Sequence, residues 1–371
     1  MYDPAGVLED DYIPARGSLV DRSLRRTAAL WMELPDEFAD MGLDLFYLPN
    51  HLREALIRAL GRCMGKDFTL DMFKCIIAPR QDDGNGSNVP DDWDWNRDFT
   101  HLSIPPSLLT STTFPVLISY LYPKRVESND DVKESWDADD NGPPAPPRQL
   151  IPAITHLSLA IPPGETGPAP SWKHLLSMSK KLPSLTHLSL AYWPKPMRTP
   201  HAMNASVVGG PAGTVAYSGT TMYSHALDND WSEAVHIIRQ LSKSLYQLKH
   251  LDLTGCTSWF QALIGCIEQI QDTDADADAG FVRRVGRPQM KLVGTVDWVR
   301  DWGNMETIRM RSGLVVRGGD ATGLTAADRN RLEEGIQLST RLERIVTAHR
   351  GGKGKIITVE KDSVYDFRLP A

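Results

Sequence analysis

The chain has few cysteines, no long apolar run and no leader-like start. Its 371 residues include four irregularly spaced cysteines, Cys63, Cys75, Cys256 and Cys266. So few thiols exclude a small disulfide-built module, and the lack of any Cys-x2-Cys pair argues against a finger-type zinc site. No stretch approaches the roughly 20 apolar residues of a transmembrane helix, and the acidic residues 1–11 lack the apolar core of a signal peptide. We therefore expect a cytoplasmic or nuclear protein without a transmembrane segment.

An excess of basic charge is also missing, since the formal net charge is −7 at pH 7. Binding to nucleic acids or anionic membranes relies on basic clusters. The small group of Arg283, Arg284 and Arg287 is flanked by acidic loops, so we expect no nucleic-acid partner. Apolar residues make up 41% of the chain, which is enough for a folded protein that also carries polar loops.

A short phrase that contains His-Leu recurs four times. Its copies lie at residues 100–104, 155–159, 186–190 and 249–253. A repeated phrase of strand length is typical of a stacked array of repeats rather than of a single folded core. Such an array favours a function in surface recognition.

Apolar residues extend two of these phrases to the spacing Leu-x2-Leu-x2-Leu-x-Leu. The frames are Leu182, Leu185, Leu188 and Leu190, then Leu245, Leu248, Leu251, Leu253 and Cys256, and more weakly Trp302, Met305, Ile308 and Met310. They resemble leucine-rich repeats of the ribonuclease-inhibitor or F-box-associated kind, over roughly residues 98–345. The phrases at 188–194 and 251–256 are similar to those of fungal leucine-rich-repeat proteins. The resemblance implies an α/β solenoid with parallel strands on its concave face and helices on its convex face.

The repeats are irregular in length. Their anchors, Leu102, Leu157, Leu188, Leu251 and Ile308, are 55, 31, 63 and 57 positions apart. Leucine-rich repeats usually span roughly 20 to 29 residues, so three of the gaps are about twice as long as one repeat. Each long gap holds either a degenerate repeat or an inserted loop. Polar, Pro-rich and Gly-rich composition favours insertion, because such stretches cannot bury a strand.

Composition and repeats together divide the chain into four parts. We expect a flexible N-terminal segment at 1–40, a helical cap with a first degenerate repeat at 41–97, the solenoid at 98–348 and a tail at 349–371. The insertions, two of them acidic, lie near 124–149, 195–224 and 271–290. Apolar residues at helical spacing predict an amphipathic helix near 325–348.

Residues 42–65 place apolar side chains at helical spacing around a Leu48-Pro49 step. This helix resembles the Leu-Pro opening of an F-box, which docks onto a ubiquitin-ligase adaptor. A second interpretation is a capping helix, since the terminal repeat of an array otherwise exposes its core. The aromatic-rich part that follows in an F-box is not evident, which favours the cap.

The alternation of side chains along a strand predicts where the histidines point. If the leucines face the core, the neighbouring histidines face the concave surface, and strands about 4.8 Å apart align them in a column. We assign partner binding to His101, His156, Ser158, His187, Ser189, His250 and Asp252. Structural packing of these histidines is the alternative. Metal ligation is disfavoured, because a flat ladder diverges whereas tetrahedral ligands converge.

His225 and Asp230 form a His-x4-Asp pair. It is similar to that of the glycerolipid acyltransferases, tafazzin included, in which the Asp orients the His as a general base. Asp230 also suits a helix cap, and the second block of that family has no counterpart after the His. The alternating Asp residues of 272–278 lack the Gly and Glu of a calcium loop, which favours a solvated loop.

The favoured function is therefore a non-enzymatic scaffold or adaptor that binds a protein through its concave face. An F-box-like substrate receptor of a ubiquitin ligase is one alternative, and a tafazzin-like phospholipid acyltransferase is another. The sequence does not identify the protein partner. We expect neither a cofactor nor a metal.

Overall fold

The repeated His-Leu phrases form short strands, as their alternating pattern predicts. In the computed structural model they are β1 (His101–Ser103), β2 (His156–Ser158), β3 (His187–Ser189) and β6 (His250–Asp252), and the weaker fifth copy forms β9 (Thr307–Met310). A further strand, β10 (Thr358–Lys361), pairs with β9 in parallel. The predicted α/β class with parallel strands is confirmed.

The structure describes residues 7–34, 45–79, 96–123, 149–163, 170–197, 206–208, 214–216, 232–264, 266–269, 290–293, 296–314, 325–352 and 354–362. Contacts divide the chain into two compact units. One unit consists of residues 9–159, and the other of residues 160–371 together with 1–8. None of the helices in the described ranges has both the length and the apolar character that crossing a membrane requires.

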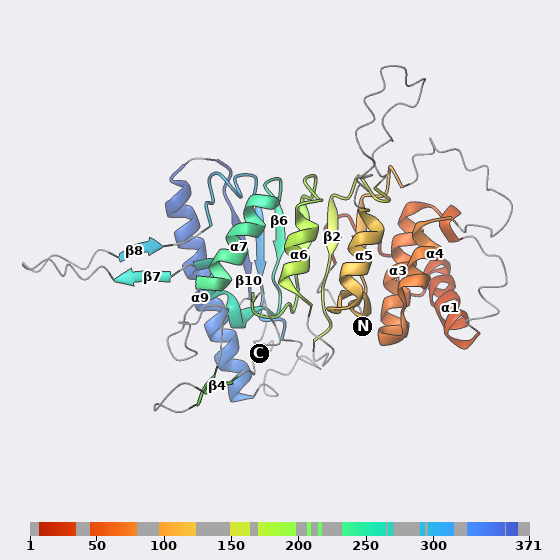
Figure 1. The fold of residues 1–371 in the computed structure, drawn as a ribbon, viewed down its shortest axis with the longest axis horizontal. Coiled ribbons are helices and arrows are strands. Elements are labelled where there is room, and N and C mark those ends of the chain that lie inside the picture. Colours follow the sequence, from red (N-terminus) through yellow and green to blue (C-terminus); the bar gives the residue numbers. More distant parts are fainter. Residues whose placement is uncertain are drawn as a thin grey trace, which may run out of the picture. The chain divides into compact units, whose positions relative to one another are not determined.

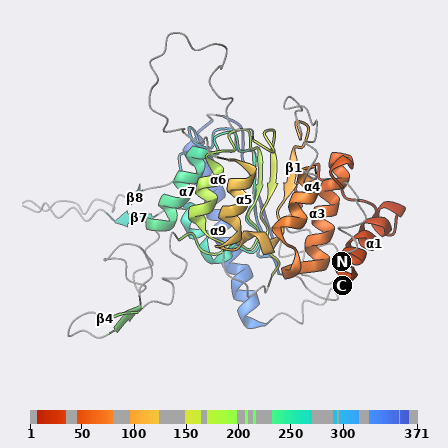
Figure 2. The same ribbon diagram turned by 45° about the vertical axis from the view of Figure 1, so that its right-hand side comes forward.

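In the unit of residues 9–159, helices surround two paired strands. The helices are α1 (Leu19–Glu33), α3 (Asn50–Met64), α4 (Leu70–Ile77) and α5 (Thr113–Leu121), with the 3-10 turns η1 (Leu45–Tyr47), η2 (Gly65–Asp67) and η3 (Pro106–Leu109). β1 and β2 are parallel, and His101 lies opposite His156. α3 contacts α1, α4 and β1, so it covers the strand as well as the other helices (Figure 2).

The helix α1 lies within residues 1–40, where the sequence predicts a flexible segment. Ser18 caps its first turn, because Ser18 Oγ accepts a hydrogen bond from Asp21 N at 3.2 Å. In return, the Asp21 carboxylate accepts one from Gly17 N at 2.8 Å. This Ser-x-x-Asp spacing is a signal for a helix start. The pattern is easy to miss because Ala28 and Trp31 are the only apolar residues of α1 that are buried.

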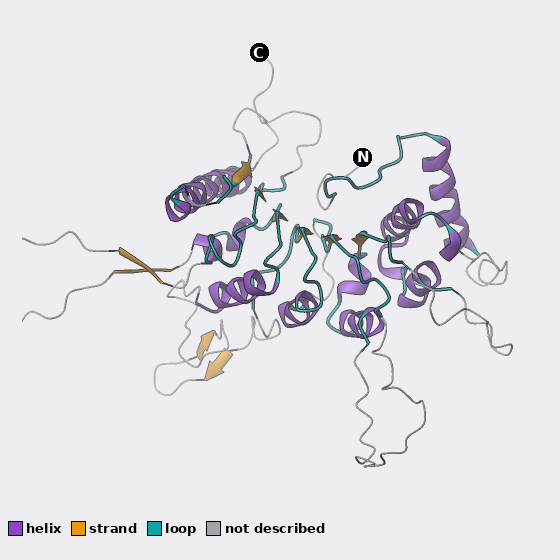
Figure 3. Cartoon of the chain, turned by 90° about the horizontal axis from the view of Figure 1, so that it is seen from above, coloured by secondary structure: helices purple, strands orange, loops and turns teal. Residues whose placement is uncertain are grey.

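In the unit of residues 160–371, β3, β6, β9 and β10 form a parallel sheet in that order. The helices are α6 (Trp172–Ser179), α7 (Ser232–Ser244), α8 (Gln261–Ile264) and α9 (Ala326–Arg350), with the 3-10 turn η7 (Thr257–Trp259) before α8. α6 and α7 contact each other (Figure 1). Viewed along the strands, the helices of this unit lie on one side of the sheet (Figure 3).

Strands from successive phrases pair directly despite the long gaps between them. β1 pairs with β2, β3 with β6, and β6 with β9. These gaps therefore hold insertions rather than a further repeat strand. Two antiparallel hairpins occur in them, β4 (Ser206–Val208) with β5 (Thr214–Ala216) and β7 (Cys266–Gln269) with β8 (Met290–Val293). Residues 124–148, and most of 195–224 and 271–290, lie outside the described residues.

The leucine frames form the core of the sheet. All their residues are at most 3% exposed, namely Leu182, Leu185, Leu188, Leu190, Leu245, Leu248, Leu251, Leu253, Cys256, Trp302, Met305, Ile308 and Met310. The register aligns Leu188, Leu251 and Ile308 in one row. The prediction that Leu188 and Leu251 are buried on neighbouring parallel strands is confirmed.

Hydrogen bonds join the turn after β6 to the turn after β3. Cys256 is fully buried, and its Sγ donates a hydrogen bond to the carbonyl of Leu190 at 3.2 Å. Trp259 Nε1 donates to the carbonyl of Trp193 at 2.9 Å, and both rings pack edge-to-face near Trp172. Burial raises the pKa of the Cys256 thiol, so this cysteine acts as a structural bridge between turns rather than as a nucleophile.

The C-terminal part adds one predicted and one unpredicted element. α9 begins with a capping box formed by Thr325 and Asp328, which confirms the amphipathic helix expected near 325–348. β10 lies within residues 349–371, which the sequence assigns to a tail. The sequence indicates this strand only by the alternation of apolar and polar residues, with Ile357 and Val359 buried and Thr358 exposed.

Candidate functional site

The strands of the unit of residues 160–371 carry polar side chains on the face opposite the leucine row. The register aligns His187, His250, Thr307 and Thr358 in one row, and Ser189, Asp252, Arg309 and Glu360 in the next. We name these eight residues, together with Arg311 directly after β9, the polar face. It contains four of the seven residues to which the sequence assigns partner binding.

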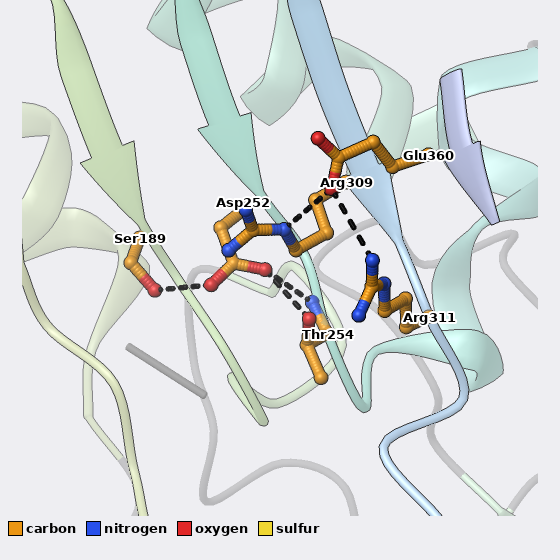
Figure 4. A network of polar contacts seen from close by, with 6 residues as sticks. All are labelled: Ser189, Asp252, Thr254, Arg309, Arg311 and Glu360. Carbon is orange, nitrogen blue, oxygen red and sulfur yellow. Dashed lines mark hydrogen bonds and ion pairs between the residues drawn. The ribbon is translucent and has the colours of Figure 1, made fainter. Parts of the chain in front are cut away.

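Ser189 and Asp252 form the first half of the second row, and their side chains are hydrogen-bonded within the protein. Asp252 Oδ2 accepts one from Ser189 Oγ at 2.9 Å (Figure 4). Asp252 Oδ1 accepts two from Thr254, from the backbone N at 3.0 Å and from Oγ1 at 2.7 Å. Ser189 and Asp252 are both 0% exposed. They therefore lock β3 to β6 and to the turn that follows, and the expected partner contact by these two side chains is not available.

Arg309 and Glu360 form the second half of this row, and both are partly exposed to solvent, as is Arg311 directly after β9. Arg309 Nε donates to Glu360 Oε2 at 2.8 Å, and Arg311 Nη2 lies 3.7 Å from the same oxygen (Figure 4). The side chains of Arg309, Glu360 and Arg311 are 25%, 31% and 51% exposed. Burial raises the pKa of Glu360, but the hydrogen bond from Arg309 and the charges of both arginines outweigh burial and hold it below its usual value.

Sequence reasoning missed this charged cluster. The signal was present in β9 and the residue after it, where Ile308 and Met310 alternate with Arg309 and Arg311. Such alternation marks a strand with one buried face and one polar face. The partner residue Glu360 could not be found in this way, because it lies on β10, which the sequence analysis did not identify.

Tyr192 supports the edge of the sheet at which Arg311 lies. Its backbone has φ +59°, and its hydroxyl donates to the carbonyl of Gly313 at 2.8 Å. Gly255 and Gly313 both adopt positive φ, and a Cβ on either would come within 3 Å of the Tyr192 side chain. Only glycine permits this approach, so Tyr192 spans the turns after β6 and β9 and keeps them in place.

The histidines of the polar face pair with each other. The rings of His187 and His250 are stacked with centroids 5.6 Å apart. Thr186 Oγ1 is hydrogen-bonded to His187 Nδ1 at 2.8 Å, which fixes the ring. His250 is 5% exposed, whereas His187 is half-buried. Of the two, His187 is the ring that a partner can reach.

The unit of residues 9–159 repeats this arrangement more tightly. The rings of His101 and His156 stack at 3.9 Å, and each Nδ1 is hydrogen-bonded to the hydroxyl of the preceding Thr. Burial lowers the pKa of His101 and so favours the neutral form of the stacked ring. His156 and Ser158 are 9% and 3% exposed. The prediction of an open histidine column thus needs correction, because five of the seven assigned side chains are buried against their neighbours.

The other two candidates from the sequence, the His225–Asp230 pair and the acidic residues of 272–278, lie outside the described residues. Within the described ranges, no group of three or more His, Cys, Asp or Glu side chains is placed to hold a metal ion. The arrangement suits recognition by charge and hydrogen bonding on rigid strands. No family model matches the chain, and neither a curated protein nor a solved structure matches it.

Proposed function

We propose that the chain is a non-enzymatic protein-binding scaffold or adaptor, built as a leucine-rich-repeat-like solenoid, and that its polar face binds the partner. The repeat interpretation is supported by the buried leucine frames, the parallel register and the helices that come after β1, β2, β3, β6 and β9 along the chain. A concave sheet is the surface that such repeats commonly use for binding. The expected cytoplasmic or nuclear location stays a prediction.

One observation carries this proposal, namely the solvent-accessible cluster of Arg309 on β9, Glu360 on β10 and Arg311 directly after β9. A strand holds side chains more firmly than a loop does, so less entropy is lost when they bind. The register places Arg309 opposite Asp252, whose buried hydrogen bond with Ser189 joins β3 to β6. The charged cluster therefore lies beside a strand pair that is held by buried polar contacts.

The balance of charge in the cluster favours a protein over a nucleic acid. Both arginines are paired with Glu360, so the surface presents cationic and anionic groups side by side. Nucleic-acid binding requires basic clusters that can neutralise phosphates. Protein interfaces, by contrast, commonly match charges of both signs and gain specificity from them.

A charge reversal tests the polar face. The partner is first identified by proximity labelling in the native cell, and its affinity is then measured with purified proteins. Arg311→Glu should weaken binding by about tenfold or more, since like charges then meet across the interface. Lys243→Glu, an exposed residue on α7, is the matched control and should bind normally. Equal affinity of both variants would place the binding surface elsewhere.

The two alternatives from the sequence stay predictions. The F-box-like receptor requires α3 to bind a ligase adaptor, whereas the contact of α3 with β1 suits a capping helix. A pull-down of the adaptor with the chain and with a variant lacking residues 42–65 distinguishes these roles. The acyltransferase requires His225 and Asp230 to share a pocket, and substitution of either residue tests it directly.

A further inference from the structure

An acidic segment of the chain lies against α3 in the unit of residues 9–159. Glu9, Asp10 and Asp11 are consecutive acids, and Asp10 turns the backbone through a positive φ of 63°. The turn brings Asp11 Oδ2 to 3.3 Å from Arg58 Nη1. The side chains of this ion pair are only 6% and 10% exposed. A surface segment has thus placed a carboxylate into a nearly closed site.

The site also contacts the residue that follows the carboxylate. Arg58 Nη2 donates to the carbonyl of Tyr12 at 3.3 Å. The ring of Tyr12 packs edge-to-face on His51, with centroids 4.8 Å apart. Arg58 and His51 both belong to α3 and are seven residues apart, so they lie on one face of the helix, two turns from each other. Together they recognise an acid followed by an aromatic residue.

The edge of β1 forms the other side of the site. Glu54 is buried on α3, and its carboxylate accepts a hydrogen bond from the backbone N–H of His101. Burial lowers the pKa of His101, while the nearby charges of Asp11 and Asp10 act in the opposite direction. The acidic segment therefore lies next to both α3 and β1, which are rigid elements.

The segment does not satisfy the site completely. Among the described residues, the buried Nε of Arg58 finds no hydrogen-bond acceptor. A carboxylate normally binds a guanidinium through two parallel hydrogen bonds, one of which can come from Nε. The segment itself remains at the surface, since Glu9 and Asp10 are exposed and Ile13 is 42% exposed. The carboxylate of a separate peptide, which is not tethered to the chain, would accept a hydrogen bond from Arg58 Nε as well.

We propose that Arg58, His51 and the edge of β1 form a docking site for an acidic peptide with a carboxylate followed by an aromatic residue. Residues 9–12 occupy this site in cis and must be displaced by such a peptide from a partner protein. The proposal does not depend on the polar face, which lies in the other unit. It predicts that binding in trans is limited by the chain's own segment.

A peptide titration on the full chain tests the proposal. The probe is a fluorescent synthetic peptide with the sequence of residues 8–14, and its binding is followed by fluorescence anisotropy. The double variant Asp11→Asn/Tyr12→Ala, which weakens the hold of the segment, should bind the probe about tenfold or more tightly than the unaltered chain. Adding Arg58→Gln to that variant should abolish binding, whereas adding the exposed Lys66→Gln should not. A probe in which Asn replaces the acid equivalent to Asp11 should bind poorly.

A second measurement uses the unaltered chain and so avoids any effect of substitution on folding. Trypsin cleaves after the exposed Arg16, and an excess of unlabelled peptide should accelerate this cleavage by displacing the segment. The Asn-substituted peptide should leave the rate unchanged. If the peptide neither accelerates cleavage nor binds the double variant more tightly than the unaltered chain, residues 9–12 are a permanent structural strap and the proposal is wrong.

Discussion

Arg53 on α3 and Arg350 on α9 are both buried, one in each unit, but different groups surround them. Arg53 is 3% exposed and donates to the side-chain carbonyls of Asn96, at 2.7 Å, and of Asn50. The rings of Phe46 and Phe99 lie about 5 Å from its guanidinium. Burial lowers its pKa to about 10, and the charge of Glu54 opposes this effect.

Arg350 is 5% exposed and donates mainly to backbone carbonyls. Its Nε reaches the carbonyl of Trp298 at 3.1 Å, its Nη2 that of Trp302 at 2.7 Å, and its Nη1 that of Lys355. One side chain thus joins the end of α9, the turn after Trp298 and the residues that lead into β10. Burial lowers the pKa of Arg350 as well.

The difference shows how each unit holds the helix that carries its buried arginine. Desolvating a guanidinium is unfavourable unless its hydrogen bonds are satisfied. Arg53 donates to one backbone carbonyl, that of Ile76 at 3.4 Å, but its other contacts are the side chains of Asn50 and Asn96 and two rings, which a substitution can remove one at a time. Around Arg350 they are carbonyls from two segments, residues 298–303 and Lys355, so the path of the backbone itself depends on this residue. The unit of residues 160–371 should therefore be the more sensitive to loss of its buried arginine.

The largest effect is expected for Arg350→Ala. It leaves several buried carbonyls without donors, and we expect a loss of about 3 to 5 kcal/mol in the free energy of unfolding. Urea unfolding followed by tryptophan fluorescence measures it. Arg350→Lys should recover only part of the loss, because an ammonium cannot fork to several carbonyls. The exposed Arg344→Ala on the same helix is the control, and an equal loss there would contradict the role of Arg350.

A second comparison concerns the leucine row and the exposed surface. Leu251→Ala should lower the free energy of unfolding by about 2 to 5 kcal/mol, through lost burial and a cavity. Leu19→Ala, at a residue that is 80% exposed, should change it by less than about 0.5 kcal/mol. Urea unfolding of both variants checks the contrast. A small effect at Leu251 would argue against the repeat core.

The smallest effect is a pH dependence that arises from Glu54 in the unit of residues 9–159. Burial raises the pKa of Glu54 to about 7, where the charge of Arg58 opposes the rise and that of Asp11 adds to it. The unfolded carboxyl loses its proton near its ordinary value of 4.5, so this contribution to stability is complete below that pH and is lost as the pH rises through 7. We expect the loss to be roughly 1 to 3 kcal/mol.

Urea unfolding at pH 5.5 and pH 8 measures this dependence, and Glu54→Gln should reduce it. The exposed Asp67→Asn serves as the control and should leave this pH dependence unchanged.

His101 contributes a pH dependence of the opposite sign, since its lowered pKa reduces the free energy of unfolding as the pH falls below about 6.5. Arg53, with a pKa of about 10, stays charged over this range and does not contribute to the dependence. If Glu54→Gln loses as much free energy of unfolding between pH 5.5 and pH 8 as the unaltered chain does, another group causes the dependence.

Much of the sheet follows from local patterns. The four His-Leu phrases predict four strands, and the leucine frames predict the buried row at Leu188 and Leu251. α9 follows from apolar spacing and its Thr325–Asp328 cap. α1 and β10 were missed because their apolar stripes are short, and β10 becomes a strand only by pairing with β9. The candidate site was found in part, since the rows were predicted but the exposed cluster at Arg309, Arg311 and Glu360 was not.

The sequence by itself determined which residues alternate along each strand, because that alternation is a property of extended backbone. Only the tertiary structure decided which polar side chains stay accessible. Ser189 and Asp252 are 63 positions apart and meet only through the pairing of β3 with β6, which buries both. Arg58 meets Asp11, and Arg350 meets Trp298, across comparable separations. Burial, charge pairing and pKa depend on such distant neighbours, and no local pattern specifies them.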